Sequence, residues 1–249
     1  MKDLFSAGSQ SYQLSRPSYP QAVLQEILRH VEQRELAWDC GAGSGQFTQL
    51  LAPYFDQVVA TDLSAQQLQY APQFDNVSYQ VQPAEQTSFM PQSFDLISVA
   101  QAIHWFDFDQ FYAEVERCLK PNGVLAIVGY GLIHVHHPEV SVLLQHLYHE
   151  RLHGYWAPER VYVDECYQTL PFPFVEIESP VLKMQYLWSA QQLLDYLSTW
   201  TAVRQYRQQQ HLNPLAELEG FIAHQQIQFQ VEFPILLRLG RKPSHKRGH

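Results

Sequence analysis

The sequence predicts an α/β fold in which helices cover both faces of a mostly parallel sheet. Three observations predict it. Apolar stretches with strand character alternate with stretches of helical periodicity over the first 130 residues. A glycine-rich turn follows the first of these strands. After residue 130 the alternation stops, and two strands return near the C-terminus as an antiparallel edge. Strands that alternate with helices pair in parallel through right-handed crossovers, which gives a doubly wound sheet.

Each element has its own signal in the sequence. The first helix is expected at 20–33, because apolar residues recur there at helical spacing behind Pro20. The parallel strands are expected at 36–39, 58–62, 77–81, 94–99 and 124–128. The helices between them are expected at 47–52, 64–71 and 109–119, with a turn at 121–123. The antiparallel edge comprises 181–186 and 229–238, separated by helical segments at 190–209 and 214–225.

The 249 residues are expected to form a single domain with an insertion. Residues 131–174 are rich in His, Tyr and Pro and lack the strand–helix alternation. They predict a helical lid inserted into a core formed by residues 1–130 and 175–249.

Composition and charge limit the function classes. With 46% hydrophobic and 16% charged residues the chain is typical of a globular protein. Its net charge of -9 repels phosphate backbones, so nucleic acid is not expected as a partner. The basic segment 241–249 is interpreted as a disordered, solubilising terminus. Three cysteines without a CxxC pair, no signal peptide and no membrane span predict a cytoplasmic protein.

The candidate ligand site is the run Asp39-Cys40-Gly41-Ala42-Gly43-Ser44-Gly45. Glycine at these spacings lets the backbone come close to a ligand at the carboxyl end of a strand. The run lacks the Lys-Ser/Thr pair of a P-loop. It also fails the dinucleotide pattern GxGxxG/A, because the sixth position is Gln46. What remains is a glycine loop led by an acid.

Asp62 ends the second strand, 23 residues after Asp39. A carboxylate at this place in a strand–loop–helix–strand unit can accept both hydroxyls of a ribose. The alternative is that Asp62 caps the helix that starts near Ser64.

Several segments carry a resemblance to a known family. They are the glycine loop, Asp62 and residues 12–20, 100–106, 119–123 and 198–202. With these, the chain resembles the class I S-adenosylmethionine-dependent methyltransferases. More narrowly it resembles the branch that contains trans-aconitate methyltransferase and related small-acid methyltransferases. The resemblance covers nearly the whole chain and implies a Rossmann-like sheet, with S-adenosylmethionine as cofactor and S-adenosylhomocysteine as product.

The resemblance implies roles for matching positions. The glycine loop and Gln101 would lie at the methionine part of the cofactor, Asp62 at its ribose and Ala84-Glu85 at its adenine. Many relatives carry an Asp before that Ala, but here the position is Pro83, which leaves the adenine contact to Glu85, Gln82 or the backbone. Arg16 would pair with the cofactor carboxylate, or lie solvated at a helix end. The implied cofactor set is Arg16, Asp39, Gly41, Ala42, Gly43, Gly45, Asp62, Leu63, Ala84, Glu85 and Gln101.

By the same resemblance, Tyr19, His104, Trp105 and Trp200 would line the pocket of the methyl acceptor, although each aromatic ring is also compatible with core packing. Three roles stay open for His104: general base, substrate contact, or packing beside Trp105. A carboxylate acceptor is already an anion at neutral pH and needs no base, whereas a phenol or amine profits from one.

The expected reaction is O-methylation of a small carboxylic acid by in-line displacement. A phenol, an amine or a carrier-bound acyl group is the alternative acceptor. The alternative outside the enzymes is an inactive interaction protein that binds the cofactor without catalysis. The expected assembly is a monomer or dimer.

One motif competes with this interpretation. Residues 149–153 read His-Glu-Arg-Leu-His, the HExxH pattern of zinc proteases. No third ligand follows at the spacing of metzincins, since the expected position is Glu159. The α/β pattern around the motif is also wrong for such a protease, so no metal site is predicted. The cluster His134, His136 and His137 is interpreted as a polar loop.

Overall fold

The computed structural model describes residues 16–223, 225 and 228–244. Residues 12–15 of the segment 12–20 lie outside the described residues, as do residues 245–249 of the basic terminus.

Five parallel strands form the centre of the sheet, in the order β3, β2, β1, β4, β5. Their bounds are Leu36–Cys40 for β1, Gln57–Asp62 for β2, Val77–Val81 for β3, Phe94–Ala100 for β4 and Leu119–Tyr130 for β5. The long strand β9 (Phe229–Arg241) pairs antiparallel with β5. The prediction of a mostly parallel sheet with an antiparallel C-terminal edge strand is confirmed.

Three short strands also pair with β9, with β6 and β8 on opposite edges of it. β7 (Val175–Ile177) pairs with the end of β9 at Arg241. β6 (His134–Val135) and β8 (Lys183–Trp188) pair with the part of β9 before Ile235. One strand therefore belongs to the parallel sheet at one end and to a separate antiparallel region at the other.

The helices of the parallel half cover the two faces of the sheet. They are α2 (Gln21–Leu28), α3 (Thr48–Leu51), α4 (Ala65–Gln69) and α5 (Phe108–Cys118), with 3-10 turns η1 (Ala52–Tyr54) and η2 (Ile103–Trp105). The apolar stripe of α2, centred on Leu24 and Ile27, is buried in one core cluster. The stripe of α5, with Phe111 and Val115, is buried in the other. Helix α2 ends before the predicted 33, although Val31 is still buried.

The predicted turn at 121–123 lies inside β5 rather than before it. The pairing of β5 with β4 shifts register between Phe94 and Leu96, so the intervening residues of β5 bulge out. Asn122 takes the left-handed φ of 65° that such a bulge requires. The residues at 121–123 therefore do interrupt the regular strand, but as a bulge within β5 and not as a turn before it.

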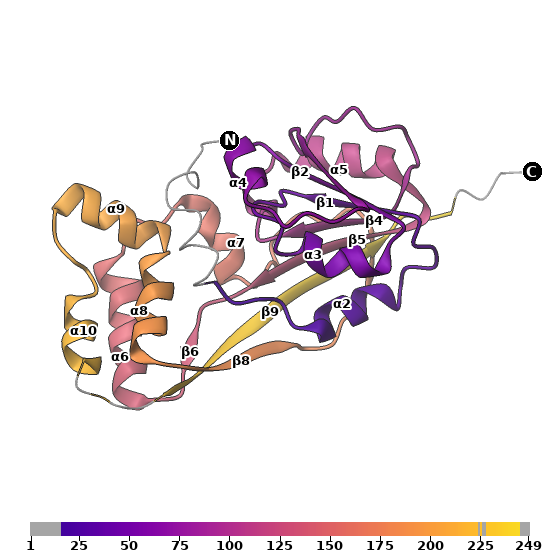
Figure 1. The fold of residues 1–249 in the computed structure, drawn as a ribbon. Helices are drawn as coiled ribbons and strands as arrows, with labels where there is room; N and C mark the ends of the chain where they lie inside the picture. The colour runs from indigo at the N-terminus through magenta and orange to yellow at the C-terminus, as the bar shows by residue number, and fades with distance from the viewer. Residues whose placement is uncertain (1–15, 224, 226–227, 245–249) are drawn as a thin grey trace, which may run out of the picture.

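A group of helices lies to one side of the parallel sheet (Figure 1). From 131–174 come α6 (Pro138–His146), η3 (Leu147–Arg151), η4 (Pro158–Arg160) and α7 (Val161–Asp164). From the region after β8 come α8 (Ala190–Ser198), α9 (Thr201–Gln210) and α10 (Ala216–Ile222). Helix α10 packs on α6, and the rings of Tyr155 and Tyr206 lie 5.0 Å apart. These elements, α6 to α10, are called the cap below.

The cap is therefore wider than the predicted lid at 131–174. Residues 190–222 join it because β8 and β9 run beyond the parallel sheet and carry α8–α10 to the same side (Figure 1). No helix in the described part of the chain is long and apolar enough to cross a bilayer.

The first residues of the basic terminus are part of the fold, which corrects the interpretation of 241–249 as disordered. Arg241 ends β9 and donates from Nη2 to the carbonyl of His30 at 2.9 Å. Lys242 is buried, with 3% of its surface exposed, and its Nζ donates to the carbonyl of Leu119 at 3.0 Å. The two cations donate to backbone carbonyls after α2 and at the start of β5, and so they tie the end of β9 to these segments.

Candidate functional site

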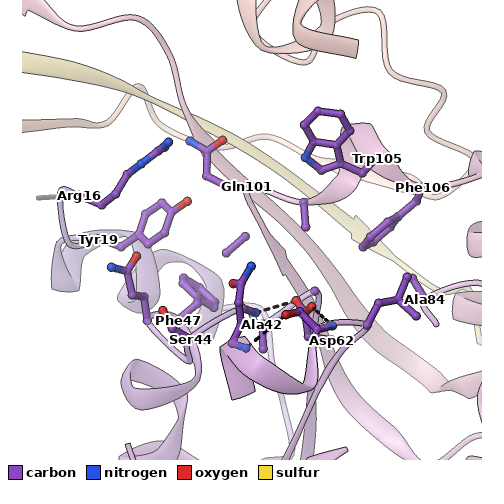
Figure 2. A pocket seen from close by; sticks show the side chains of 18 of the residues that line it. Arg16, Tyr19, Ala42, Ser44, Phe47, Asp62, Ala84, Gln101, Trp105 and Phe106 are labelled. Carbon is purple, nitrogen blue, oxygen red and sulfur yellow. Dashed lines mark hydrogen bonds between the residues drawn. The ribbon is translucent and has the colours of Figure 1, made fainter. Parts of the chain in front are cut away.

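A cavity of about 220 Å³ lies where the parallel strands end (Figure 2). Its wall is built from the segments that follow β1, β2, β3 and β4, together with the end of β5 and the chain before α2. In open α/β sheets this is the edge at which ligands bind. The wall comprises Arg16, Tyr19, Gly41, Ala42, Gly43, Ser44, Gln46, Phe47, Asp62, Leu63, Ser64, Gln67, Gln82, Ala84, Ala100, Gln101, Ala102, Trp105, Phe106 and Tyr130.

The glycine loop after β1 presents bare backbone to this cavity. Gly41 has a φ of 68°, and a Cβ built on it would lie 2.6 Å from the Cβ of Ala102 and 3.1 Å from the ring of Phe106. A side chain at this position is therefore excluded by both space and backbone conformation. The loop turns back on itself, since the N–H of Gly45 donates to the carbonyl of Ala42 at 2.9 Å.

The Asp62 carboxylate is fixed at the edge of the cavity by two backbone donors. Gly43 N–H donates to Oδ2 at 2.9 Å, and Ser64 N–H donates to Oδ1 at 2.8 Å (Figure 2). The cap of α4 is a different side chain, because the Ser64 hydroxyl accepts from the N–H of Gln67 at 3.3 Å. A carboxylate oxygen carries more than one lone pair and can accept more than one hydrogen bond.

Asp39 lies behind the glycine loop and not on the wall. Its carboxylate is completely buried and accepts from the Thr48 hydroxyl at 2.6 Å and from the Ser98 hydroxyl at 2.9 Å. Burial raises the pKa of Asp39 to about 6 in spite of these two donors. The residue therefore joins the end of β1 to α3 and β4, at the point where the glycine loop begins.

Gln101 occupies the end of β4 in a strained backbone conformation. Its φ is 56°, in the left-handed region that non-glycine residues rarely adopt. The conformation is held by two hydrogen bonds to β5: its N–H donates to Val128 O at 2.9 Å, and its Nε2 donates to Tyr130 O at 3.1 Å. Such strain is stored most often at functional sites.

Arg16, Tyr19 and Phe47 lie on the side of the cavity away from Asp62 (Figure 2), and Tyr130 belongs to the same wall. The ring of Tyr19 is buried 5.4 Å from that of Phe47 and 6.0 Å from that of Tyr130. Arg16 donates from Nη1 to the Tyr130 hydroxyl at 2.9 Å. The Tyr19 hydroxyl has no hydrogen-bond partner among the described residues, and burial raises its pKa well above the ordinary value.

Five of the residues expected in the site are absent from the wall: Asp39, Gly45, Glu85, His104 and Trp200. Gly45 packs beneath the loop against Ala71. Glu85 points away and accepts from the N–H of Asp107 at 3.2 Å. Trp200 packs within the cap, 5.7 Å from the ring of Tyr148 and 5.4 Å from that of Trp156.

His104 is buried beside the wall and not on it. Its ring lies 4.9 Å from that of Trp105 and 6.5 Å from that of Tyr167. Burial, followed by the positive charge of Arg160, lowers the pKa of His104 to about 3. The imidazole is therefore neutral over the whole physiological range.

Some wall residues were missed by the sequence analysis: Gln46, Phe47, Ser64, Gln67, Ala100, Ala102, Phe106 and Tyr130. The signal for Ala100 and Tyr130 was their place at the carboxyl ends of two expected neighbouring strands. Gln82, which also lies on the wall, was named in the sequence analysis only as a possible contact to adenine.

Comparisons with known proteins decide the family. A model of the methyltransferase domain matches residues 38–127, which include the glycine loop, Asp62 and Gln101. A methyltransferase of Dictyostelium discoideum is 38% identical over 202 residues, which cover 80% of this chain and 77% of that protein. The chain belongs to the class I S-adenosylmethionine-dependent methyltransferases.

Further likenesses agree with this. A solved structure of a type II methyltransferase from Anaeromyxobacter dehalogenans superposes on this methyltransferase with a TM-score of 0.84 and 41% identity, over 92% of this chain and 99% of that one. An S-adenosylmethionine-dependent methyltransferase of Saccharomyces cerevisiae is 31% identical over 131 residues, 49% of this chain and 45% of that protein.

The cavity of this methyltransferase fits its cofactor, S-adenosylmethionine. The bare backbone at Gly41 leaves a cradle that a Cβ would fill, which suits the close approach of an amino-acid moiety. The Asp62 carboxylate has the chemistry to accept ribose hydroxyls. Leu63 lines the same cavity with 43% of its surface exposed, an apolar surface suited to a flat base.

The HExxH motif of the methyltransferase lies in the cap. Residues 147–151 form a π-helical turn, and the Glu150 carboxylate lies 3.3 Å from Nε2 of His146. Within the described residues, no three His, Cys, Asp or Glu side chains are grouped so that they could hold a metal ion.

Asp62→Asn is expected to weaken binding of S-adenosylhomocysteine by roughly 10- to 50-fold, because charged hydrogen bonds to a ligand contribute about 1.5–3 kcal/mol. The amide also leaves either Gly43 N–H or Ser64 N–H without an acceptor. Isothermal titration calorimetry measures the effect. Asp56→Asn, which removes an exposed carboxylate just before β2, is the control and is expected to bind normally.

Proposed function

We propose that this methyltransferase transfers a methyl group to a carboxylate oxygen of a small acid, as in the small-acid branch that its Gln101–Phe106 segment resembles. The observation that carries the proposal is the chemistry of the wall. Its ionisable residues, all within the described chain, are Arg16, Tyr19, Asp62 and Tyr130. Asp62 accepts two backbone N–H groups, Arg16 is a cation, and burial raises the pKa of Tyr19.

None of these side chains is suited to take a proton from an acceptor. An acceptor that arrives already ionised needs no such group, and a carboxylate, with a pKa of roughly 4, is ionised at neutral pH. The arginine on the wall also adds a positive charge that favours an anion.

When bound, S-adenosylmethionine supplies a methyl group on a positively charged sulfur, which keeps the electron pair of the broken bond. The loop at Gly41–Gly43 holds the amino-acid end of the cofactor, and Arg16 and Gln101 close over it. Asp62 accepts the ribose hydroxyls. Leu63, Gln82 and Ala84 line the adenine end, where Pro83 offers no donor. Tyr19 and Trp105 exclude water from the acceptor.

The proposal is tested by offering the purified protein, with S-adenosylmethionine, a panel of small carboxylic acids, phenols and amines. We expect methylated products from acids, recognised by mass and by hydrolysis in mild alkali, to which esters alone in the panel are sensitive. Methylation of phenols or amines without any acid would overturn the proposed acceptor. A protein that binds S-adenosylhomocysteine in calorimetry but methylates nothing would favour the inactive interaction protein.

The pH dependence offers an independent check. Because the pKa of His104 is lowered to about 3, the ring stays neutral from pH 5 to pH 9. We therefore expect the pH profile of kcat/KM to have the same shape near neutrality in the native protein and in His104→Gln. A profile that rises through pH 6–7 in the native protein and flattens in His104→Gln contradicts this, and indicates an acceptor that must be deprotonated.

A further inference from the structure

A second polar site lies where the cap meets the parallel half of the molecule. The turn η2, which carries His104, packs against η4, which ends at Arg160. Tyr167 follows α7 and lies near both, since its ring is 6.5 Å from that of His104 and the charge of Arg160 acts on the pKa of its hydroxyl. The cavity wall described above includes none of these three residues.

Two buried polar atoms at this junction have no partner. The His104 Nδ1 and the Tyr167 hydroxyl each lack a hydrogen bond within the described residues. Leaving such a group buried and unpaired costs about 1–3 kcal/mol, so native structures rarely keep two together without a use.

Arg160 supplies a cation that is held from one side only. Its Nε donates to the Tyr148 hydroxyl at 3.0 Å and to Asp164 Oδ1 at 3.2 Å. Its guanidinium carbon lies 5.7 Å from the centre of the Tyr148 ring and 5.2 Å from that of Trp156. The plane of the guanidinium is thus fixed, while its two terminal nitrogens make no hydrogen bond within the described residues. These two nitrogens are the fork with which arginine binds a carboxylate.

The position of Tyr167 is maintained at a cost. Cys166 and Tyr167 both have left-handed backbone, with φ of 54° and 61°. Each such residue costs roughly 1 kcal/mol or more. The ring of Tyr167 lies directly on Gly129 of β5, where a Cβ would come within 2.7 Å of it. Successive residues of a strand face opposite sides of the sheet, so Tyr167 packs on the face away from the Tyr130 side chain. The junction reaches the cavity through Trp105, a wall residue whose ring lies 4.9 Å from that of His104.

We propose that Arg160, His104 and Tyr167 form the binding site for a carboxylate of the methyl acceptor. This inference rests on the proposed function and deepens it, since it names the residues that select an anionic acceptor. The guanidinium fork of Arg160 binds the two oxygens, and the hydroxyl of Tyr167 and the Nδ1 of His104 donate to them.

The cap participates directly in this site, because Arg160 belongs to it while His104 belongs to the parallel half. His104 and Tyr167 are buried there, whereas the Arg160 side chain keeps 26% of its surface exposed, so the acceptor reaches the junction past Arg160. Its carboxylate then supplies the hydrogen bonds that the junction lacks in its absence.

The test compares equilibrium binding of benzoate, glutarate and sorbate with that of their uncharged amides, in protein saturated with S-adenosylhomocysteine. We expect at least one acid to bind about tenfold or more tightly than its amide, because charged hydrogen bonds contribute about 1.5–3 kcal/mol. Arg160→Met is expected to abolish this preference and Arg160→Lys to keep part of it. In turnover, Arg160→Met is expected to raise KM for the acid far more than it lowers kcat.

Two controls keep the test decisive. Arg151→Met removes another cap arginine, which pairs with Glu217 at 3.3 Å on the surface, and is expected to change nothing. Tyr167→Phe removes one hydroxyl and keeps the ring on Gly129, so it is expected to weaken acid binding several-fold without unfolding the cap. Thermal unfolding and S-adenosylhomocysteine binding verify that each variant is folded.

The outcomes separate the two proposals. If Arg160→Met and Tyr167→Phe prefer acids over amides as strongly as the wild type does, the proposed anion site is wrong. It is also wrong if the wild-type protein binds every acid and its amide equally. Ester formation that persists in those variants leaves the proposed function standing. An acid preference that depends on Arg160, combined with no ester from any acid, supports the anion site and rejects the proposed reaction.

Discussion

Gly41→Ala is expected to reduce binding of S-adenosylhomocysteine by more than about 100-fold, a loss of roughly 2.7 kcal/mol or more. The added Cβ would lie 2.6 Å from that of Ala102, which is closer than carbon atoms can approach. It would also hold alanine at a φ of 68°, which costs about 1–2 kcal/mol for an L-residue. The loop has to move to relieve the collision with Ala102 and the strained backbone. It then no longer forms the floor of the cavity.

The matched control is Gly154→Ala in the cap. Gly154 has an equally left-handed φ of 82°, but no atom lies within 4 Å of a Cβ built there. The control therefore carries the same backbone cost without the collision, and its cofactor binding is expected to be normal. Calorimetry that finds Gly41→Ala within about threefold of wild type would show that the loop does not form the floor of the cofactor site.

Asp39→Asn is expected to stabilise the free protein at pH 8. An unfolded aspartate releases its proton near pH 3.8, whereas burial raises the pKa of Asp39 in the fold to about 6. Between these values the folded state binds more protons than the unfolded state, so stability falls as the pH rises through this window. The loss is complete above the folded pKa and amounts to about 3 kcal/mol at most, since each pKa unit corresponds to about 1.4 kcal/mol.

The asparagine variant stays uncharged and avoids this loss. Urea unfolding at pH 4.5 and pH 8 measures it: the advantage of Asp39→Asn over wild type should be small at the lower pH and grow with pH. Asp95→Asn provides the contrast, because the buried Asp95 carboxylate is paired with Lys120 at 2.8 Å and its neutralisation is expected to destabilise at pH 8. An Asp39→Asn variant that is less stable than wild type at pH 8 would contradict the prediction.

The parts of the site that are local in the chain were predictable from the sequence. The glycine loop, Asp62 and Gln101 each follow a strand directly, and the strand order then brings them to one edge. The sequence does not reveal whether the acid that leads the glycine loop faces the ligand or the interior, so the buried position of Asp39 was not predictable from the motif. Trp200 lies away from the cavity wall, beside Tyr148 and Trp156 of the cap, because the sequence does not distinguish an aromatic ring that packs in a cap from one that lines this cavity.

In the fold too, features that are local in the chain were predictable and features that depend on distant residues were not. Strand and helix periodicity predicted the parallel sheet and its antiparallel edge, since these depend on short segments and fixed crossover geometry. The extent of the cap depends instead on contacts between residues far apart, such as Tyr155 with Tyr206. The junction of Arg160, His104 and Tyr167 is of the same kind, and no motif joins its members.

The position of strand β9 late in the chain affects how the protein folds during its synthesis. Among the described elements β9 is the last to be synthesised, yet it pairs with β5 at one end and with β6 and β8 at the other. Until residues 229–241 leave the ribosome, β5 has an open edge and the cap has no strand to align it. Open edges of this kind promote aggregation. Production of this protein is therefore expected to depend on how quickly translation finishes, and on chaperones that shield β5 until then.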